Sequence, residues 1–253
     1  TFIVDTVLTW SNCDIYLAED AKIEVLAGNT LNIIGSTLQA CDSLLTTPMW
    51  DGIYLDDTTA TLYTDSTTIR DAKNAVHATN GGVVQLYNSN FLDNKKNVYI
   101  NNNHNGLCSI KSNIFKTTSL HAPFTGQNTD FGVSLIWCSN IIVGESAQTP
   151  TIPRNLFEDL SVGIYLHTTD ALISHNDFKY LSNGVETFNP SFYINDEVVE
   201  VGLLKSTVDN TFFRCKNGVN STNTEIIVKN NDFRRGFTAV VAFGLRQHTL
   251  EVN

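Results

Sequence analysis

A single short phrase recurs along the chain, and it limits the fold more than any other feature of the sequence. The phrase is an apolar residue or Thr, two free positions, Asn (once Ser), one free position and then Phe, as in ISHNDF. A small residue beside Val or Ile follows five to eight residues later. The copies place their phenylalanines at Phe91, Phe115, Phe157, Phe178, Phe212 and Phe233.

The spacing of the phrase indicates a repeating structural unit. Successive phenylalanines are 24, 42, 21, 34 and 21 residues apart, and Ile69 fills the same position 22 residues before Phe91. A unit of about 22 residues explains the short steps. The two long steps require insertions or, for the step of 42, an additional degenerate unit. Regular self-similarity at such a period is the signature of a solenoid.

The segments between the turns have the character of strands. Runs such as KIEVLAG, TLNIIG and EIIVKN are short, rich in β-branched residues and alternate with a period of two. Gly, Asn, Asp and Ser punctuate them, and no helical stripe exceeds two turns. A leucine-rich repeat would need L-x-x-L-x-L-x-x-N, which is absent. The sequence therefore predicts an all-β, right-handed parallel β-helix of about nine or ten coils.

The phrase also predicts the interior of this β-helix. Alternate residues of a strand face the same side, so the Asn and the Phe of each phrase point inward together. We expect the phenylalanines to form one stack, because coils lie about 4.8 Å apart. A buried amide needs a partner, so the matching amides should bond from coil to coil. This predicted ladder comprises Asn113, Asn155, Asn176, Asn210 and Asn231.

Three segments break the period and are predicted loops, namely 117–131, 144–151 and 186–200. GIYL occurs in both halves, at Gly52–Leu55 and Gly163–Leu166, which indicates one template throughout. We therefore expect residues 1–253 to form a single β-helix domain. Because an uncapped last coil would be exposed, we also expect flanking domains of the same polypeptide, or end-to-end self-association.

Composition restricts the partners. The formal net charge is −10, and an acidic surface repels phosphate backbones, which argues against nucleic acid as a partner. No apolar run approaches the ~18 residues of a membrane-spanning helix. The five cysteines show neither C-x-x-C pairs nor zinc spacing, so no metal site is predicted and buried thiols are expected. A disulfide between Cys108 and Cys138 is left open.

The run AGNTLNIIGSTLQAC, followed by MWDGIYLDDTTATLYTDSTTIRDAKNAV, resembles the β-helix regions of large secreted surface proteins of Bacteroidetes-type bacteria. This resemblance covers residues 20–76. The remainder resembles only the general repeat of pectate-lyase-like β-helices. The resemblance of residues 20–76 implies a secreted or cell-surface location. It implies no single activity, because this fold carries lyases, hydrolases and adhesins alike.

Charged residues of the phrase suggest a candidate site on the outward face of 154–234. Polysaccharide lyases need an Arg or Lys base and often Ca²⁺ on clustered acids, whereas glycoside hydrolases need paired carboxylates. No acid recurs in one position over three coils, so Ca²⁺ and catalysis are disfavoured and no cofactor is predicted. The alternative is a solvated face whose charges pair, Glu158 with Lys179. The catalytic candidates are Arg154, Glu158, His175, Asp177, Lys179 and Asp209.

Aromatic residues beside acids in the 186–200 segment suggest a second candidate, because aromatic rings stack on sugars. Packing of the loop onto the β-helix is the alternative. Asp56 and Asp57 form a weaker cation candidate, for which an acidic turn is the alternative. The carbohydrate-binding candidates are Phe188, Phe192, Tyr193 and Asp196.

The sequence as a whole favours a non-catalytic extracellular module, acting as a rigid surface scaffold or adhesin that contacts polysaccharides or cell-surface glycans. The first alternative is a polysaccharide lyase or glycoside hydrolase using the 154–234 face. The second is a fibre-forming subunit that stacks through open coil ends.

Overall fold

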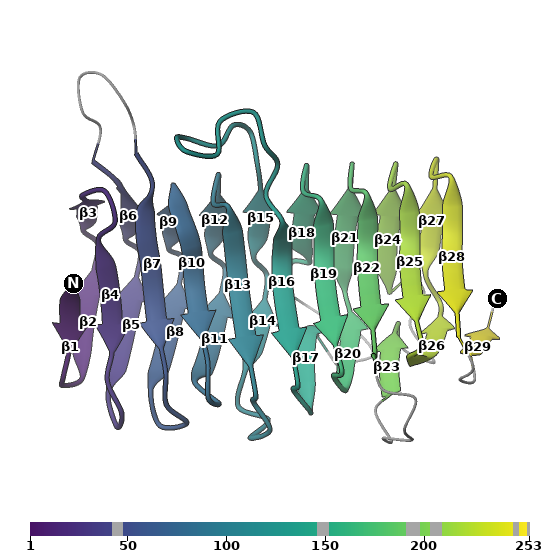
Figure 1. Ribbon diagram of the computed structural model, residues 1–253, viewed down its shortest axis with the longest axis horizontal. Coiled ribbons are helices and arrows are strands. Elements are labelled where there is room, and N and C mark those ends of the chain that lie inside the picture. Colours follow the sequence, from purple (N-terminus) through teal and green to yellow (C-terminus); the bar gives the residue numbers. More distant parts are fainter. Residues whose placement is uncertain (42–47, 146–151, 191–197, 203–208, 245–247, 252–253) are drawn as a thin grey trace.

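The structure is a computed structural model that describes residues 1–41, 48–145, 152–190, 198–202, 209–244 and 248–251. Within these residues every regular element is a strand, and every strand pairs in parallel with the strand of the neighbouring coil. The predicted fold class is confirmed: the chain is a right-handed parallel β-helix, elongated along its axis (Figure 1).

Three parallel sheets, here called A, B and C, run the length of the β-helix. Sheet A contains β1 (Phe2–Val4), β4 (Lys22–Val25), β7 (Trp50–Leu55), β10 (Ala72–Ala78), β13 (Lys96–Asn101), β16 (Phe131–Ile136), β19 (Val162–His167), β22 (Asn183–Phe188), β25 (Asn217–Thr222) and β28 (Thr238–Phe243). Sheet B contains β2 (Leu8–Ser11), β5 (Thr30–Ile34), β8 (Thr61–Asp65), β11 (Val83–Tyr87), β14 (Ser109–Lys111), β17 (Ile141–Gly144), β20 (Ala171–Ser174), β23 (Val198–Val201), β26 (Glu225–Lys229) and β29 (His248–Glu251). Sheet C contains β3 (Asp14–Leu17), β6 (Thr37–Ala40), β9 (Thr68–Arg70), β12 (Asn90–Leu92), β15 (Ile114–Lys116), β18 (Asn155–Glu158), β21 (Asn176–Lys179), β24 (Asn210–Phe213) and β27 (Asp232–Arg234).

The register settles how the long steps of the repeat arise. β15 pairs directly with β18, which sets Phe115 beside Phe157. The 42-residue step is therefore one enlarged coil, and the alternative of an additional degenerate unit is wrong. In the same way β21 pairs with β24, so the 34-residue step is also a single coil. Insertions enter at the corners between sheets, where they leave strand pairing intact.

The predicted phenylalanine stack is confirmed. Neighbouring rings from Phe91 to Phe233 have centroids 4.7 to 5.1 Å apart and planes inclined by 9 to 18°. Ile69 continues the column beside Phe91, as predicted, and Leu38 follows in the next coil toward the N-terminus. Full burial of each such side chain stabilises the fold by roughly 1.5–3 kcal/mol.

The small residue of the phrase faces this stack from sheet A. A Cβ atom on Gly163 would lie 2.7 Å from the ring of Phe178, and one on Gly184 would lie 2.5 Å from the ring of Phe212. Each glycine thus makes room for the phenylalanine of the next copy of the phrase. This close approach explains why the phrase keeps a small residue at a fixed place before Val or Ile.

The asparagine ladder is also confirmed. Asn155 Nδ2 donates to Asn176 Oδ1 at 2.9 Å, and Asn176 Nδ2 donates to Asn210 Oδ1 at 3.0 Å. Asn210 Nδ2 donates in turn to Asn231 Oδ1 at 2.8 Å. The same amide groups donate to carbonyls at the ends of sheet B strands, such as Ile173 O for Asn210. Each buried amide is therefore satisfied, and the ladder stitches sheet B to sheet C.

The predicted loops are confirmed in part. Residues 117–130 contain no strand, as expected, whereas β22 continues to Phe188 and β23 begins at Val198. The 186–200 interruption is therefore shorter than predicted, and residues 191–197 lie outside the described part. Of 144–151, Gly144 ends β17 and residues 146–151 are not described. All five cysteines are free thiols, so Cys108 and Cys138 form no disulfide. Cys108, Cys138 and Cys215 are buried as expected, and burial raises the pKa of Cys108 to about 12. The expectation of burial is wrong for Cys41, which is exposed, and Cys13 is only partly buried.

Candidate functional site

The structure brings four of the predicted catalytic candidates together at the corner between sheets B and C. Arg154 Nη1 donates to Asp209 O at 2.9 Å and lies 3.4 Å from Asp177 Oδ1. The Asp209 carboxylate accepts hydrogen bonds from Ser174 Oγ at 2.8 Å and from the His175 backbone N–H at 3.1 Å. These contacts join three coils and give the cluster a structural role in fixing the corner.

The prediction that His175 and Asp209 face outward is wrong. Asp209 is 2 % exposed and His175 is 8 % exposed. His175 occupies the left-handed region with φ of 62°, so alternation of side chains stops there and the imidazole Nε2 lies 2.9 Å from Ile152 O. A turn residue at a corner does not continue the pattern of the strand.

Glu158 and Lys179 lie side by side on neighbouring strands of sheet C, β18 and β21, but the predicted ion pair between them is wrong. Glu158 Oε2 instead pairs with Lys116 Nζ of the preceding coil at 2.9 Å. Both side chains of this pair are partly exposed, so it contributes about 0–1 kcal/mol. The ion pair accounts for the charges of Glu158 and Lys116.

The other candidates are placed as follows. Phe188 ends β22 and is half-exposed, 5.5 Å from the ring of His167. Phe192, Tyr193 and Asp196 lie outside the described residues. Asp57 accepts a 2.8 Å hydrogen bond from Thr59 N, and Asp56 accepts one of 2.7 Å from Asn80 Nδ2, which matches the acidic-turn alternative.

A groove that sequence reasoning missed lies at the corner between sheets C and A. In four successive coils the chain turns through three residues after the sheet C strand, and these triplets form a trough of about 630 Å³. We call it the C–A trough. Its triplets are 159–161 (DLS), 180–182 (YLS), 214–216 (RCK) and 235–237 (RGF).

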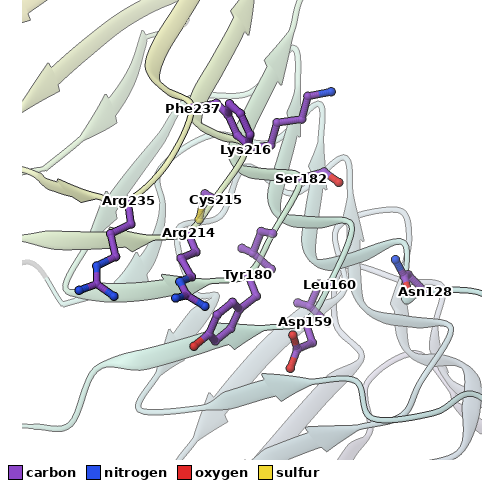
Figure 2. A pocket seen from close by; sticks show the side chains of 11 residues that line it. Asn128, Asp159, Leu160, Tyr180, Ser182, Arg214, Cys215, Lys216, Arg235 and Phe237 are labelled. Atoms are coloured by element: carbon purple, nitrogen blue, oxygen red, sulfur yellow. The ribbon is translucent and has the colours of Figure 1, made fainter.

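Each position of the triplet has its own place in the trough. The first residue adopts the left-handed conformation, with φ of 57° at Asp159 and 55° at Arg214, and forms one wall. The second residue, such as Leu160 or Leu181, is buried and forms the floor. At the third position, Ser182, Lys216 and Phe237 form the opposite wall. Figure 2 shows the first-position side chains of Tyr180, Arg214 and Arg235 together, across from Lys216 and Phe237.

The C-terminal end of the C–A trough is basic and aromatic. Within the described part of the chain, Arg214, Lys216 and Arg235 form no ion pair. The Arg214 guanidinium lies 5.8 Å from the Tyr180 ring centroid, and those of Arg214 and Arg235 lie 5.5 and 5.7 Å from that of Phe213. Aromatic faces hold the two guanidiniums near the trough without neutralising them.

The other end of the C–A trough is acidic and polar. Asp159 lies there with Asn128 and Ser182 (Figure 2). Burial raises the pKa of the Asp159 carboxyl, and the neighbouring Glu158 carboxylate raises it further, while Lys116 acts in the opposite direction. A carboxylate, an amide and a hydroxyl together are a set suited to the hydroxyl groups of a ligand.

A sequence signal for the C–A trough does exist. The first residue of each C–A corner stands two positions after the Phe of the phrase, so the phrase locates this position in every coil. It is Asp93 after Phe91, Asp159 after Phe157 and Arg214 after Phe212. The change from acid to base along this column is readable without a structure. That the column borders a hollow is not, because the burial of the middle residue depends on how the corners stack.

Across the described residues, no three His, Cys, Asp or Glu side chains are grouped so that they could hold a metal ion. The described residues contain no helix that is long and apolar enough to span a membrane. Neither a known family model, nor a curated protein, nor a solved structure matches the chain.

Proposed function

We propose that the chain is a non-catalytic extracellular β-helix module, a rigid surface scaffold or adhesin, that holds an anionic glycan in the C–A trough. The observation that carries this proposal is the row of Arg214, Lys216 and Arg235 without ion pairs. A secreted or cell-surface location, expected from the resemblance of residues 20–76, belongs to the same proposal.

The charge of the molecule supports an anionic ligand. The chain carries a formal net charge of −10, so its surface as a whole repels anions. Three cations that form no ion pair among the described residues concentrate the positive potential of such a surface in one place. Guanidiniums bind carboxylates and sulfates through paired hydrogen bonds, which favours a ligand carrying these groups.

The aromatic residues support a sugar as the carrier of the charge. Tyr180 is 43 % exposed and Phe237 is 93 % exposed, so both offer apolar ring surface beside the cations. A pyranose ring has an apolar face that packs on aromatic rings, while its substituents reach polar groups. A linear polymer also fits the shape, since the trough runs from coil to coil along the axis.

Binding is preferred over the alternative of a polysaccharide lyase or hydrolase for a geometric reason. Of the six catalytic candidates, His175 and Asp209 are buried and Glu158 is held by Lys116. None of the six lines the C–A trough. The six candidates and the groove that would hold the polymer are therefore on different parts of the coil.

The test is a binding titration of the intact chain against a neutral glycan, a polyuronate and a sulfated glycan. We expect the anionic polymers to bind with an affinity that falls with salt. The double variant Arg214→Ala/Arg235→Ala should lose at least about tenfold in affinity, since two charge-assisted contacts are removed. The matched control is Lys22→Ala/Lys111→Ala, which removes two cations that are engaged in ion pairs elsewhere.

Two results would contradict the proposal. Equal loss of affinity in the control would mean that net charge, not the trough, attracts the glycan. Release of unsaturated or reducing chain ends, with or without Ca²⁺ and abolished by Lys179→Ala, would make the protein an enzyme.

A further inference from the structure

The C–A trough ends where the longest described loop leaves the β-helix. The coil that precedes Asp159 has its own C–A corner between Thr117 and Asp130, and residues 118–128 are inserted there. Ser161 N donates to Thr129 O at 2.9 Å, which fixes the returning end of the loop directly beside the first triplet of the trough. A polymer lying along the corner must therefore stop at this insertion.

The loop is held against the N-terminal coils on both sides. Asp93 Oδ1 accepts hydrogen bonds from Thr118 N at 2.6 Å and from Ser119 N at 3.0 Å. His121 Nε2 lies 3.2 Å from Asp71 Oδ1, one coil further toward the N-terminus. In Figure 1 this teal loop rises between β15 and β16 and leans toward the N-terminal coils.

The returning limb of the loop is fixed as well. Lys95 Nζ donates to Asp130 Oδ1 at 2.6 Å and to Asn128 O at 3.1 Å. The Thr129 hydroxyl donates to Asn94 O at 2.5 Å. These contacts hold Asn128 at the end of the trough. The corner of Asp71 and Asp93 is thus occupied by the chain itself, and the end of the trough is a built wall.

The two ends of the C–A trough differ in chemistry in a way that gives a bound polymer a direction. The closed end offers Asn128, Asp159 and Ser182, which suit hydroxyl groups. The C-terminal end offers Arg214, Lys216 and Arg235, which suit carboxylate or sulfate. From the first triplet to the last there are three coil spacings, roughly 14 Å at about 4.8 Å each. This length holds a short run of sugar rings.

We infer that the C–A trough binds the end of a linear anionic glycan and not its middle. The terminal sugar sits against the loop, with its free hydroxyls on Asp159, Asn128 and Ser182. The acidic groups of the following sugars lie on Arg214, Lys216 and Arg235. This inference rests on the proposed function, since it adds direction and chain-end selectivity to the same groove.

The experiment measures how many protein chains one polymer binds. A linear polyuronate and a linear sulfated glycan, each as long polymers and as short oligomers, are mixed with excess intact protein, and the mass of the complex is measured by sedimentation. End binding predicts one protein per polymer at every length, and oligomers that bind as tightly as the polymer. A count that rises with polymer length would overturn the inference and leave the proposed function standing.

Two variants sharpen the result. Replacing residues 119–127 by a short Gly-Ser turn opens the closed end, so the number of proteins per polymer should rise with length. Asn128→Ala/Ser182→Ala removes only neutral side-chain groups and should weaken oligomer binding at least about fivefold without changing its salt dependence. Unchanged oligomer binding by this second variant would overturn the inference. If the wild-type protein binds neither polymer, the proposed function itself is overturned.

Discussion

At the corner between sheets B and C, the N-terminal coils carry Ser36, Thr67 and Ser89 in the column where the C-terminal coils carry asparagines. A hydroxyl has one proton to donate, and Thr67 uses it on Ile33 O at 2.8 Å. An amide has two protons, so Asn155 bonds both the carbonyl of Ile110 and the next amide. Both solutions accept a backbone N–H from the neighbouring rung, as Ser89 Oγ does from Thr67 N at 3.3 Å, but only the amide also donates to the side chain of the next rung.

The corner between sheets C and A differs even more between the two halves. In the N-terminal coils its triplets are DAK at 71–73 and DNK at 93–95, and their charges are engaged: Lys73 pairs with Asp20 and Lys95 with Asp130. In the C-terminal coils the triplets are RCK and RGF, whose cations form no ion pair among the described residues. One backbone corner therefore serves to anchor a loop in one half and to line the C–A trough in the other.

The largest expected effect concerns the glycine column that faces the phenylalanine stack. Gly184→Ala would place a Cβ 2.5 Å from the Phe212 ring and 2.6 Å from Gly218 O, so it should lower the free energy of unfolding by about 3 kcal/mol. Denaturant unfolding checks this value. Addition of Phe212→Leu should recover part of the loss. Ala75 occupies the column in the N-terminal half, and Ala75→Gly should cost only about 1 kcal/mol; equal losses at both sites would contradict the comparison.

The second largest effect on stability is expected in the asparagine ladder. Asn176→Ala removes the link between Asn155 and Asn210 and leaves buried groups unsatisfied, so it should destabilise by about 2–3 kcal/mol. Thr67→Ala, the matched change in the N-terminal half, should cost about 1 kcal/mol. Thermal unfolding of both variants measures the difference. A Thr67→Ala loss as large as that of Asn176→Ala would show that linkage between rungs adds nothing.

A smaller and local effect is expected at the C–A corner. Asp93→Ala removes the acceptor for Thr118 N and Ser119 N, which should destabilise the packing of the loop against this corner by about 1 kcal/mol. Hydrogen exchange at these two amides should accelerate, while exchange in β12 stays unchanged. Asp159→Ala changes the same corner position in the C-terminal half and should leave the loop amides as protected as before.

The smallest effect is a pH dependence at Asp71. Burial raises the pKa of this carboxyl, against the lowering influence of Arg70 and His121. A raised folded-state pKa means that the associated stability is present below the unfolded pKa and is lost as pH rises through the folded pKa. Asp71→Asn removes the buried charge and suits the left-handed conformation, with φ of 60°. Its melting temperature should exceed that of the wild type at neutral pH, and the difference should shrink near about pH 4. A difference that grows on acidification would refute this assignment.

The fold and its register were readable from the sequence because they depend on a local period. Every coil must match its neighbours, so the Phe and Asn of the phrase mark the interior column and the strand pairing, and Phe178 stacks where the spacing places it. The enlarged coil after Phe115 was only partly readable, since an insertion and an added unit have the same length.

Side chains at the corners were decided by the tertiary structure alone. Alternation of inward and outward residues ends at a left-handed turn, which is why His175 is buried although the strand pattern directs it outward. Asp209 is buried where its carboxylate accepts the hydrogen bonds of Ser174 and of the His175 backbone. Ion pairing across coils also joins residues far apart in the chain, as for Lys116 with Glu158, and follows from insertion lengths. The repeat thus determined the β-helix, whereas the stacking of its corners decided that Arg214 and Arg235 border an open trough and that Asp93 holds a loop.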